Sequence, residues 1–302
     1  MRKIAIIGPG RVGTALAVHL ARRGYPVAAV AGRSRASLDR FLAKLTVEGM
    51  EPEIASAAEA ARRAEIVFIT TPDKVIGDIA ALLAEAAAVH EGQVVVQTSG
   101  ALSSAVLLPA AKCGASVLSF HPLQSFATVE RGIELLPGCS VVLDGDPAGI
   151  EVGGELARVL GLHTMTIPTE VKPLYHAAAC TASNYLVTLV GLSLDLLEEC
   201  GLDRGEALRA LLPLIRGTVE NVAALGVPEA LTGPIERGDT DILRGHLEAM
   251  GRRLPRLDEV YRVLGAETVR LAARKGRLSE EDIVNMLAVF EPAEGGAGGT
   301  CR

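Results

Sequence analysis

A glycine-rich segment near the start of the chain holds the first residues whose types and spacing could do chemistry. Gly8-Pro9-Gly10-Arg11-Val12-Gly13 directly follows a short apolar run and precedes a helical pattern. In that setting the first glycine permits a tight turn, the second lets the backbone approach a pyrophosphate, and the third allows close helix–strand packing. The amides of Arg11, Val12 and Gly13, at the helix N-terminus, favour an anionic ligand. We predict a dinucleotide site here; the alternative is an ordinary glycine turn.

The residues after the second predicted strand indicate which dinucleotide binds. That strand ends in Gly32-Arg33-Ser34-Arg35, and the first carboxylate after it, Asp39, already lies within the next helix. A site for NAD usually places Asp or Glu at this strand end, to bind the ribose hydroxyls. Two guanidinium groups and a hydroxyl suit a 2′-phosphate, because Arg forms paired, charge-assisted hydrogen bonds with phosphate. The sequence therefore favours NADP(H), unless both arginines are solvated surface charges.

Two further strand ends carry hydroxyl groups that could hold the cofactor. Thr70-Thr71-Pro72-Asp73 closes one predicted strand, and Thr98-Ser99-Gly100 follows the next. Ligands bind outside the carboxyl ends of parallel strands, so we expect Thr71, Pro72 and Ser99 to line the end of the site that holds the nicotinamide. The alternative is turn chemistry, which favours the same residue types.

A histidine after another strand and a lysine on a later helix are candidates for proton transfer. His121, in Ser119-Phe120-His121-Pro122, is expected at the crevice, where it could bind a substrate carboxylate or move a proton. Lys172 and His176 are four residues apart on a predicted helix and share a face. A lysine desolvated there would have a lowered pKa and could exchange a proton with a carbonyl or alkoxide. The alternatives are a structural histidine and a surface lysine.

Four more polar residues are candidate substrate ligands. Ser183 follows Lys172 by about three helical turns and returns near the same stripe. Asn184 beside it could hold the substrate or be a core amide. Thr232 and Asp241 bound a polar segment that could reach the cleft, although helix capping also explains such residues.

The pattern of elements that must position these residues is α/β. Short apolar runs alternate with Ala-rich helical stretches up to residue 168, which predicts a Rossmann-type, mostly parallel sheet with helices on both faces. The predicted strands are 3–7, 27–31, 65–70, 93–97, 116–119, 140–143 and 163–167. Only helical patterns follow, with Thr169 as the first N-cap. We therefore predict a cofactor domain over 1–168, an all-helical domain over 169–290 and a frayed tail over 291–302, with the substrate cleft between the domains.

Composition narrows the classes of partner. The 302 residues carry 30 Lys and Arg against 36 Asp and Glu, a net charge of −6, which gives no electrostatic basis for binding nucleic acid or an anionic membrane. Five cysteines without metal-ligand spacing indicate a reduced, cytoplasmic protein with no metal site. The charge-free stretch 173–194 could span a bilayer, but its polar residues favour a central helix buried on all sides.

The layout and several segments resemble the β-hydroxyacid dehydrogenase superfamily, in which a Rossmann domain precedes a helical domain like that of 6-phosphogluconate dehydrogenase. Within it, the chain resembles a poorly characterised branch with a C-terminal domain of unknown function, some of whose members are regarded as alternative ketopantoate reductases. The segments concerned are Gly-Pro-Gly-Arg-Val-Gly-Thr-Ala (8–15), Ser-Phe-His-Pro-Leu-Gln (119–124), Lys-Pro-Leu-Tyr-His-Ala-Ala-Ala (172–179), Ala-Ser-Asn-Tyr-Leu (182–186) and Leu-Thr-Gly-Pro-Ile-Glu-Arg-Gly-Asp (231–239).

The resemblance implies NADPH-dependent reduction of a small 2-oxo acid, with ketopantoate the best single candidate, by a homodimer. It implies Lys172 as general acid. His176 stands where the superfamily has an amide, and Asn184 could supply that amide. It also implies a substrate-binding role for the segment that contains Asp241. Two alternatives stay open: a prephenate or arogenate dehydrogenase, which the Ser-Phe-His-Pro segment also resembles, and a non-catalytic NADP(H) sensor.

Overall fold

The computed structural model describes residues 1–291, apart from the side chain of Arg252, and the chain divides into two compact units, residues 1–185 and 186–302. The predicted tail lies, apart from Glu291, outside the described residues. The predicted boundary near residue 168 coincides with the change from strands to helices, whereas the division into compact units falls inside a long helix.

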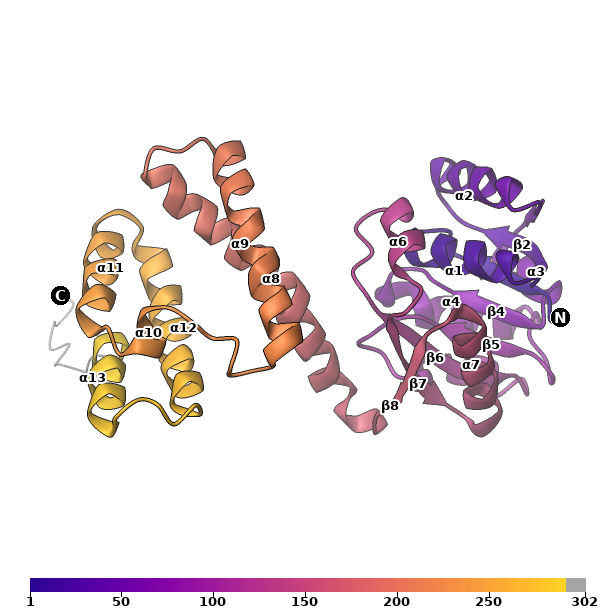
Figure 1. Ribbon diagram of the computed structural model, residues 1–302. Helices are drawn as coiled ribbons and strands as arrows, with labels where there is room; N and C mark the ends of the chain where they lie inside the picture. Colours follow the sequence, from indigo (N-terminus) through magenta and orange to yellow (C-terminus); the bar gives the residue numbers. More distant parts are fainter. Residues whose placement is uncertain (292–302) are drawn as a thin grey trace, which may run out of the picture. The chain divides into compact units, whose positions relative to one another are not determined.

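The N-terminal unit (residues 1–185) is built on one eight-stranded sheet in the order β3-β2-β1-β4-β5-β6-β7-β8 (Figure 1). All neighbouring strands are parallel except β6 and β7. The strands are β1 Ile4–Ile7, β2 Val27–Ala31, β3 Glu53–Ile54, β4 Ile66–Ile69, β5 Val94–Gln97, β6 Ser116–Leu123, β7 Ser140–Gly145 and β8 His163–Thr166. The predicted mostly parallel α/β sheet, followed by helices, is therefore the observed fold.

Helices cover both faces of the sheet, because its central strands are apolar on both sides. One core contains residues of α1 (Arg11–Arg22), α2 (Arg35–Val47) and α7 (Pro147–Leu160), and α6 (Val129–Leu135) packs against it. The opposite core contains residues of α3 (Ala57–Arg62), α4 (Ile76–Glu85) and α5 (Leu108–Ala111). Short 3₁₀ turns precede three helices: η1 Asp73–Val75, η2 Ser104–Leu107 and η3 Thr169–Val171. Strands β1 and β4 are buried at every position, as expected for two covered faces.

The structure differs from the predicted elements at β3, β6 and α6. The two-residue strand β3 and the helix α6 carry too short a pattern to be recognised. The strand predicted over 116–119 continues to Leu123, because residues beyond the end of β5 pair with the antiparallel strand β7. Thr169 does not cap a helix; its hydroxyl donates to Asp144 instead, at 3.0 Å.

The C-terminal unit, described over residues 186–291, is helical. It contains the second part of α8 (Lys172–Glu199), then α9 (Arg204–Leu225), α10 (Pro234–Arg237), α11 (Thr240–Arg253), α12 (Pro255–Ala273) and α13 (Glu280–Phe290). Its core joins α11, α12 and α13 through residues such as Leu243, Val269 and Phe290. The short helix α10 is not among the predicted elements.

The prediction that residues 173–194 form a helix buried on all sides is wrong. They do form a helix, α8, but only 6% of its most apolar 18-residue window is buried. Tyr185, Leu186 and Val187 are exposed by 59%, 40% and 72%. The absence of charged residues predicts that the side chains of this helix are buried. It does not say whether the same chain, a second protein molecule or lipid buries them. By length and composition alone, α8 is also able to cross a membrane.

Candidate functional site

The glycine loop joins β1 to α1 in a geometry that depends on its glycines. Gly8 has a φ of +99°, which side chains with a Cβ rarely adopt, and a Cβ there would lie 2.8 Å from the backbone nitrogen of Thr71. A Cβ on Gly13 would lie 2.3 Å from the Thr70 hydroxyl oxygen. A Cβ on Gly10 would meet just one atom, at 4.0 Å. The first and third glycines therefore pack tightly, and the second leaves its space open to a ligand.

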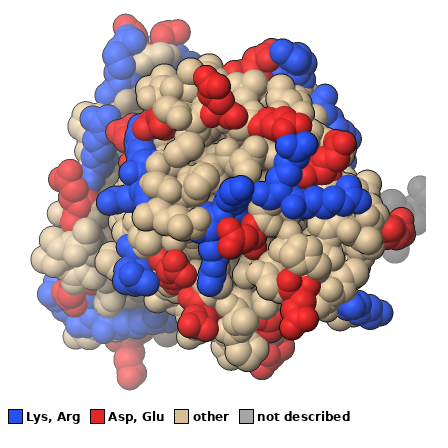
Figure 2. Space-filling model, turned by 90° about the vertical axis from the view of Figure 1, so that its right-hand side faces the viewer, with Lys and Arg blue, Asp and Glu red and all other residues tan. Residues whose placement is uncertain are grey.

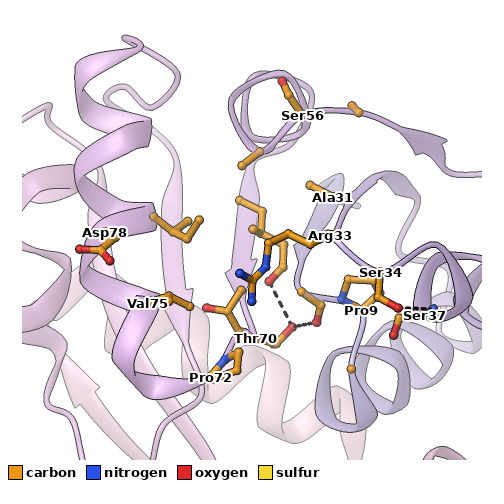
Figure 3. A pocket seen from close by; sticks show the side chains of 18 residues that line it. Pro9, Ala31, Arg33, Ser34, Ser37, Ser56, Thr70, Pro72, Val75 and Asp78 are labelled. Carbon is orange, nitrogen blue, oxygen red and sulfur yellow. Dashed lines mark hydrogen bonds between the residues drawn. The ribbon is translucent and has the colours of Figure 1, made fainter.

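A cavity of about 540 Å³ opens beside this loop, lined from the ends of β1, β2 and β4 (Figure 3). The helix N-terminus at the loop has no side-chain cap and no acidic residue in its first turn. The hydroxyl oxygen of Thr71, which lines the cavity, is buried without a partner among the described residues. An uncapped helix start and an unpaired hydroxyl are the groups that a dinucleotide phosphate would satisfy. The cavity therefore fits the predicted cofactor.

The two arginines after β2 have different surroundings. Arg33 lines the cavity and extends over it toward the side that carries Thr70 and Val75 (Figure 3). Arg35 instead forms an ion pair with Asp39 at 2.9 Å. Among the described residues, Arg33 has no carboxylate partner. Of the predicted phosphate ligands, Arg33 and Ser34 thus lie at the cavity, whereas the Arg35 side chain pairs with a residue of its own helix, α2.

Of three other predicted cofactor ligands, one lines the cavity and two have side chains that are bonded to the protein itself. Pro72 lines the cavity with Thr71. The Ser99 hydroxyl instead donates to Asp73 at 2.7 Å and accepts the amides of Ala101 and Leu102. The Arg11 guanidinium donates to the carbonyl of Ala127 at 3.1 Å, so a role for Arg11 in cofactor binding would fall to its amide.

His121 lies at the carboxyl edge of the sheet, beside the loops that follow β4 and β5. Gln97, the last residue of β5, pairs with Ser119, so the next residues of β6 extend past the end of β5. His121 pairs there with Val142 of β7. Its Nδ1 lies 2.7 Å from the hydroxyl of Tyr175 on α8. Tyr175 is a site residue that sequence reasoning missed; its position three residues after Lys172 was the available signal.

The surroundings of His121 keep it neutral. Burial, reinforced by the nearby charge of Lys172 and by His176, lowers the pKa of His121 to about 4, although Asp73 acts in the opposite direction. Burial raises the pKa of Tyr175 to about 12. At neutral pH both members of the His121–Tyr175 pair are therefore uncharged.

The second histidine of this site approaches from α8. A Cβ built on Gly100 would lie 2.8 Å from His121 Nε2 and 2.7 Å from His176 Nδ1. His176 Nδ1 is buried without a partner among the described residues, and its Nε2 lies 3.6 Å from the sulfur of Cys180. Two imidazole nitrogens therefore face the same point beside Gly100.

Lys172 is buried in a polar cluster behind this pair. Its side chain is 1% exposed, donates to the hydroxyl of Ser119 and lies 3.5 Å from a carboxylate oxygen of Asp144. Burial lowers the pKa of Lys172, as predicted, and Asp144 opposes the shift. Burial acts to raise the pKa of Asp144, but hydrogen bonds from Ser104 and Thr169 and the Lys172 charge lower it overall. Asp144 is a partner that sequence reasoning missed.

The remaining predicted residues are not brought to His121 within the N-terminal unit. Asn184 follows Lys172 by twelve residues on α8, about 18 Å at 1.5 Å per residue. Ser183, its neighbour, lies equally far along the helix. Thr232 and Asp241 belong to the C-terminal unit, and the Asp241 side chain is 98% exposed and pairs with Arg244. Their predicted contact with substrate stays a prediction.

Charges on the surface are mixed. Figure 2 shows Lys and Arg interspersed with Asp and Glu, and with uncharged surface, over the face that it draws. Across residues 1–291, no group of three or more His, Cys, Asp or Glu side chains is placed to hold a metal ion.

Two family models match separate parts of the chain. Residues 1–122 match the family model of a Rossmann-like domain, and residues 139–268 match a domain of unknown function (DUF2520). The chain thus combines a Rossmann-like domain with this second domain, whose match already begins at β7. No curated protein matches the chain.

Solved structures share the fold over most of the chain. A Bacteroides fragilis protein provisionally named an NADP oxidoreductase is 22% identical, with a TM-score of 0.73 over 89% of this chain and 98% of its own. A Thermotoga maritima protein is 26% identical, with a TM-score of 0.68 over 91% and 100%. An imine reductase from Myxococcus stipitatus in complex with NADP⁺ is 18% identical, with a TM-score of 0.60 over 94% and 99%.

Proposed function

We propose that this protein is an NADP(H)-dependent oxidoreductase that reduces a small 2-oxo acid, with ketopantoate as the best single candidate. The observation that carries the proposal is the cavity at the glycine loop, where Arg33 and the Thr71 hydroxyl lack partners among the described residues. The structural neighbours named for NADP support the same cofactor class. The choice of a 2-oxo acid comes from the family resemblance.

The chain of contacts along the sheet edge supports hydride transfer near His121. The Thr70 hydroxyl donates to Gly8 O at 2.6 Å, which ties β4 to the glycine loop, and Ser99 ties the loop after β5 to Asp73. When bound, the reduced nicotinamide supplies a hydride to a carbonyl carbon. His121 would hold the carbonyl oxygen, and the fixed loops would orient the substrate relative to it.

The surroundings of Lys172 support a positioning role for it in place of the predicted role of general acid. A general acid must come within hydrogen-bond reach of the oxygen that it protonates. The ammonium of Lys172 is enclosed and already engaged by Ser119 and Asp144. We therefore propose that Lys172 holds the start of α8 against β6 and β7, so that Tyr175 and His176 are presented to the crevice.

Cofactor titration and a substrate panel test the proposal. We expect saturable binding of NADPH by fluorescence, and NADPH consumption with at least one 2-oxo acid among 2-oxo acids, imines and prephenate. Gly13→Ala should abolish binding, because its Cβ meets Thr70, whereas Gly154→Ala meets no atom within 4 Å and serves as the control. Binding without turnover of any substrate would favour the sensor; turnover of prephenate alone would favour the dehydrogenase.

We also propose a cytoplasmic homodimer that covers the exposed apolar side chains of α8 and α9. On α9, Leu214, Val219 and Leu225 are exposed by 65%, 53% and 60%, and contiguous exposed apolar surface marks an interaction site. Light scattering coupled to size exclusion should give twice the 31.5 kDa chain mass. A monomer would contradict this, and fractionation of the chain with membranes would assign the cover of α8 to lipid.

A further inference from the structure

In the N-terminal unit, the hydroxyl of Tyr175 lies beside His121, whereas the ammonium of Lys172 is enclosed. We propose that Tyr175 acts as a positioning residue and proton source through His121: its hydroxyl donates to Nδ1, which leaves the proton of the imidazole on Nε2, facing the substrate oxygen. This inference rests on the proposed reductase function and assigns the proton path within it.

The hydrogen-bonding capacity of the pair favours this direction. A neutral imidazole has one nitrogen that donates and one that accepts, and a phenol donates a single proton. Tyr175 O and His121 Nδ1 are 2.7 Å apart, and no other described residue accepts from the Tyr175 hydroxyl. Donation to Nδ1 satisfies the phenol proton and fixes the tautomer with hydrogen on Nε2.

Nε2 of His121 lies on the far side of the imidazole from Tyr175, close to His176 and Gly100. A Cβ built on Gly100 would lie 2.8 Å from this Nε2 and 2.7 Å from Nδ1 of His176, so both imidazoles pack closely against the backbone there. Nδ1 of His176 is buried without a partner among the described residues, which costs free energy that a bound polar group would recover. A carbonyl oxygen bound to Nε2 of His121 would therefore lie near the unpaired Nδ1 of His176.

The proton balance of the step closes with Tyr175, His121 and solvent water. The carbonyl carbon would receive the hydride that a bound reduced nicotinamide supplies, the C–O π electrons would move to oxygen, and the resulting alkoxide would take the proton from Nε2. Nδ1 takes the proton of the Tyr175 hydroxyl at the same time, so the imidazole stays neutral and a phenolate is formed. An alkoxide is a stronger base than a phenolate, even one with the raised pKa of Tyr175 at about 12, so the transfer runs downhill. Solvent water then returns a proton to the Tyr175 phenolate and restores the phenol.

The tautomer can be measured without turnover. In protein labelled with ¹⁵N-histidine, and with His121→Asn used for assignment, His121 should carry its proton on Nε2. Tyr175→Phe should remove this preference and give a mixture of tautomers. Tyr185→Phe, on the same helix but exposed and outside the site, should leave the His121 signals unchanged. A proton on Nδ1 of His121 in the unmodified protein would overturn the proposal.

Turnover with the best substrate of the panel tests the proton path itself. Tyr175→Phe should lower kcat about 10²- to 10⁴-fold, the usual share of general acid catalysis, with NADPH binding unchanged. Gly100→Ala should also lower kcat, since its methyl group would displace the imidazoles of His121 and His176. Tyr185→Phe should change neither kcat nor NADPH binding.

Two outcomes separate the failure of this inference from failure of the proposed function. Full turnover by Tyr175→Phe would reject Tyr175 as proton source and leave the reductase intact. Saturable NADPH binding with no turnover of any substrate would reject the reductase, and the proton path with it.

Discussion

The two ends of the candidate site differ in how their polar groups are satisfied. At the glycine loop, the Thr71 hydroxyl and the Arg33 guanidinium lack partners among the described residues. Around α8, Lys172 and Asp144 are bonded to each other and to neighbouring hydroxyls. Buried polar groups are normally hydrogen-bonded, and the exceptions call for an explanation. Residue types indicated both ends. The glycine loop combines the unpaired, buried Thr71 hydroxyl with a cavity, whereas around α8 the unpaired buried atom is Nδ1 of His176 and the charged groups are paired.

Of the variants proposed here, Lys172→Ala should cause the largest change, which is a loss of stability. Lys172→Ala leaves the buried carboxylate of Asp144 without its cation, which typically costs about 3–5 kcal/mol. Urea unfolding should show that loss, while Lys74→Ala, an exposed lysine, should change the free energy of unfolding by less than about 0.5 kcal/mol. A stable Lys172→Ala variant that binds NADPH but has lost turnover would restore Lys172 as a catalytic group.

The neutral state of His121 predicts a pH dependence of stability. Its pKa is about 4 in the folded chain and 6.5 in a model peptide, with Lys172, His176, Asp73 and Tyr175 facing it. The unfolded state binds more protons between these values, so stability falls as pH drops from 6.5 toward 4, by up to about 3 kcal/mol.

Urea unfolding at pH 7 and pH 5 measures this loss, which His121→Asn should reduce. The imidazole signal of His121 should titrate near pH 4. A midpoint near 6.5 would show that the site is more open to water than the structure describes.

Arg33 should decide the preference between the two nicotinamide dinucleotides. Arg33→Ala should weaken NADPH binding about 10- to 100-fold, since hydrogen bonds to charged groups contribute about 1.5–3 kcal/mol, and should leave NADH binding unchanged. Arg35→Ala is the matched control, because its guanidinium is paired with Asp39. Equal losses in both variants would mean that Arg35 leaves Asp39 when the phosphate binds.

The smallest effects should come from the hydroxyls of Ser99 and Thr71, both of which the sequence predicts to be cofactor ligands. Ser99→Ala removes hydrogen bonds to Asp73, Ala101 and Leu102 and should lower stability by about 1 kcal/mol with little change in NADPH binding. Thr71→Val should weaken NADPH binding a few-fold and leave stability within about 0.5 kcal/mol. Thermal melting and NADPH titration measure the two effects. If Ser99→Ala weakened NADPH binding and Thr71→Val lowered stability, unpaired hydroxyls would not distinguish ligand-binding residues from structural ones.

The sequence by itself determined the fold class and the glycine loop. Apolar runs and helical periodicity set strands and helices locally, and Gly8 and Gly13 are required wherever a strand turns tightly into a helix that packs against it. The capping box of Ser56 and Glu59 also follows from local sequence.

Only the tertiary structure decided which of the nominated polar groups have partners. Ser119, Asp144 and Lys172 are far apart in sequence and meet because β6, β7 and the start of α8 are neighbours. The Tyr175–His121 contact and the exposure of α8 depend on packing in the same way. A polar side chain can bind either a ligand or another residue of the protein. Which of the two it binds depends on contacts between segments that are distant in sequence, and residue type and spacing do not predict those contacts.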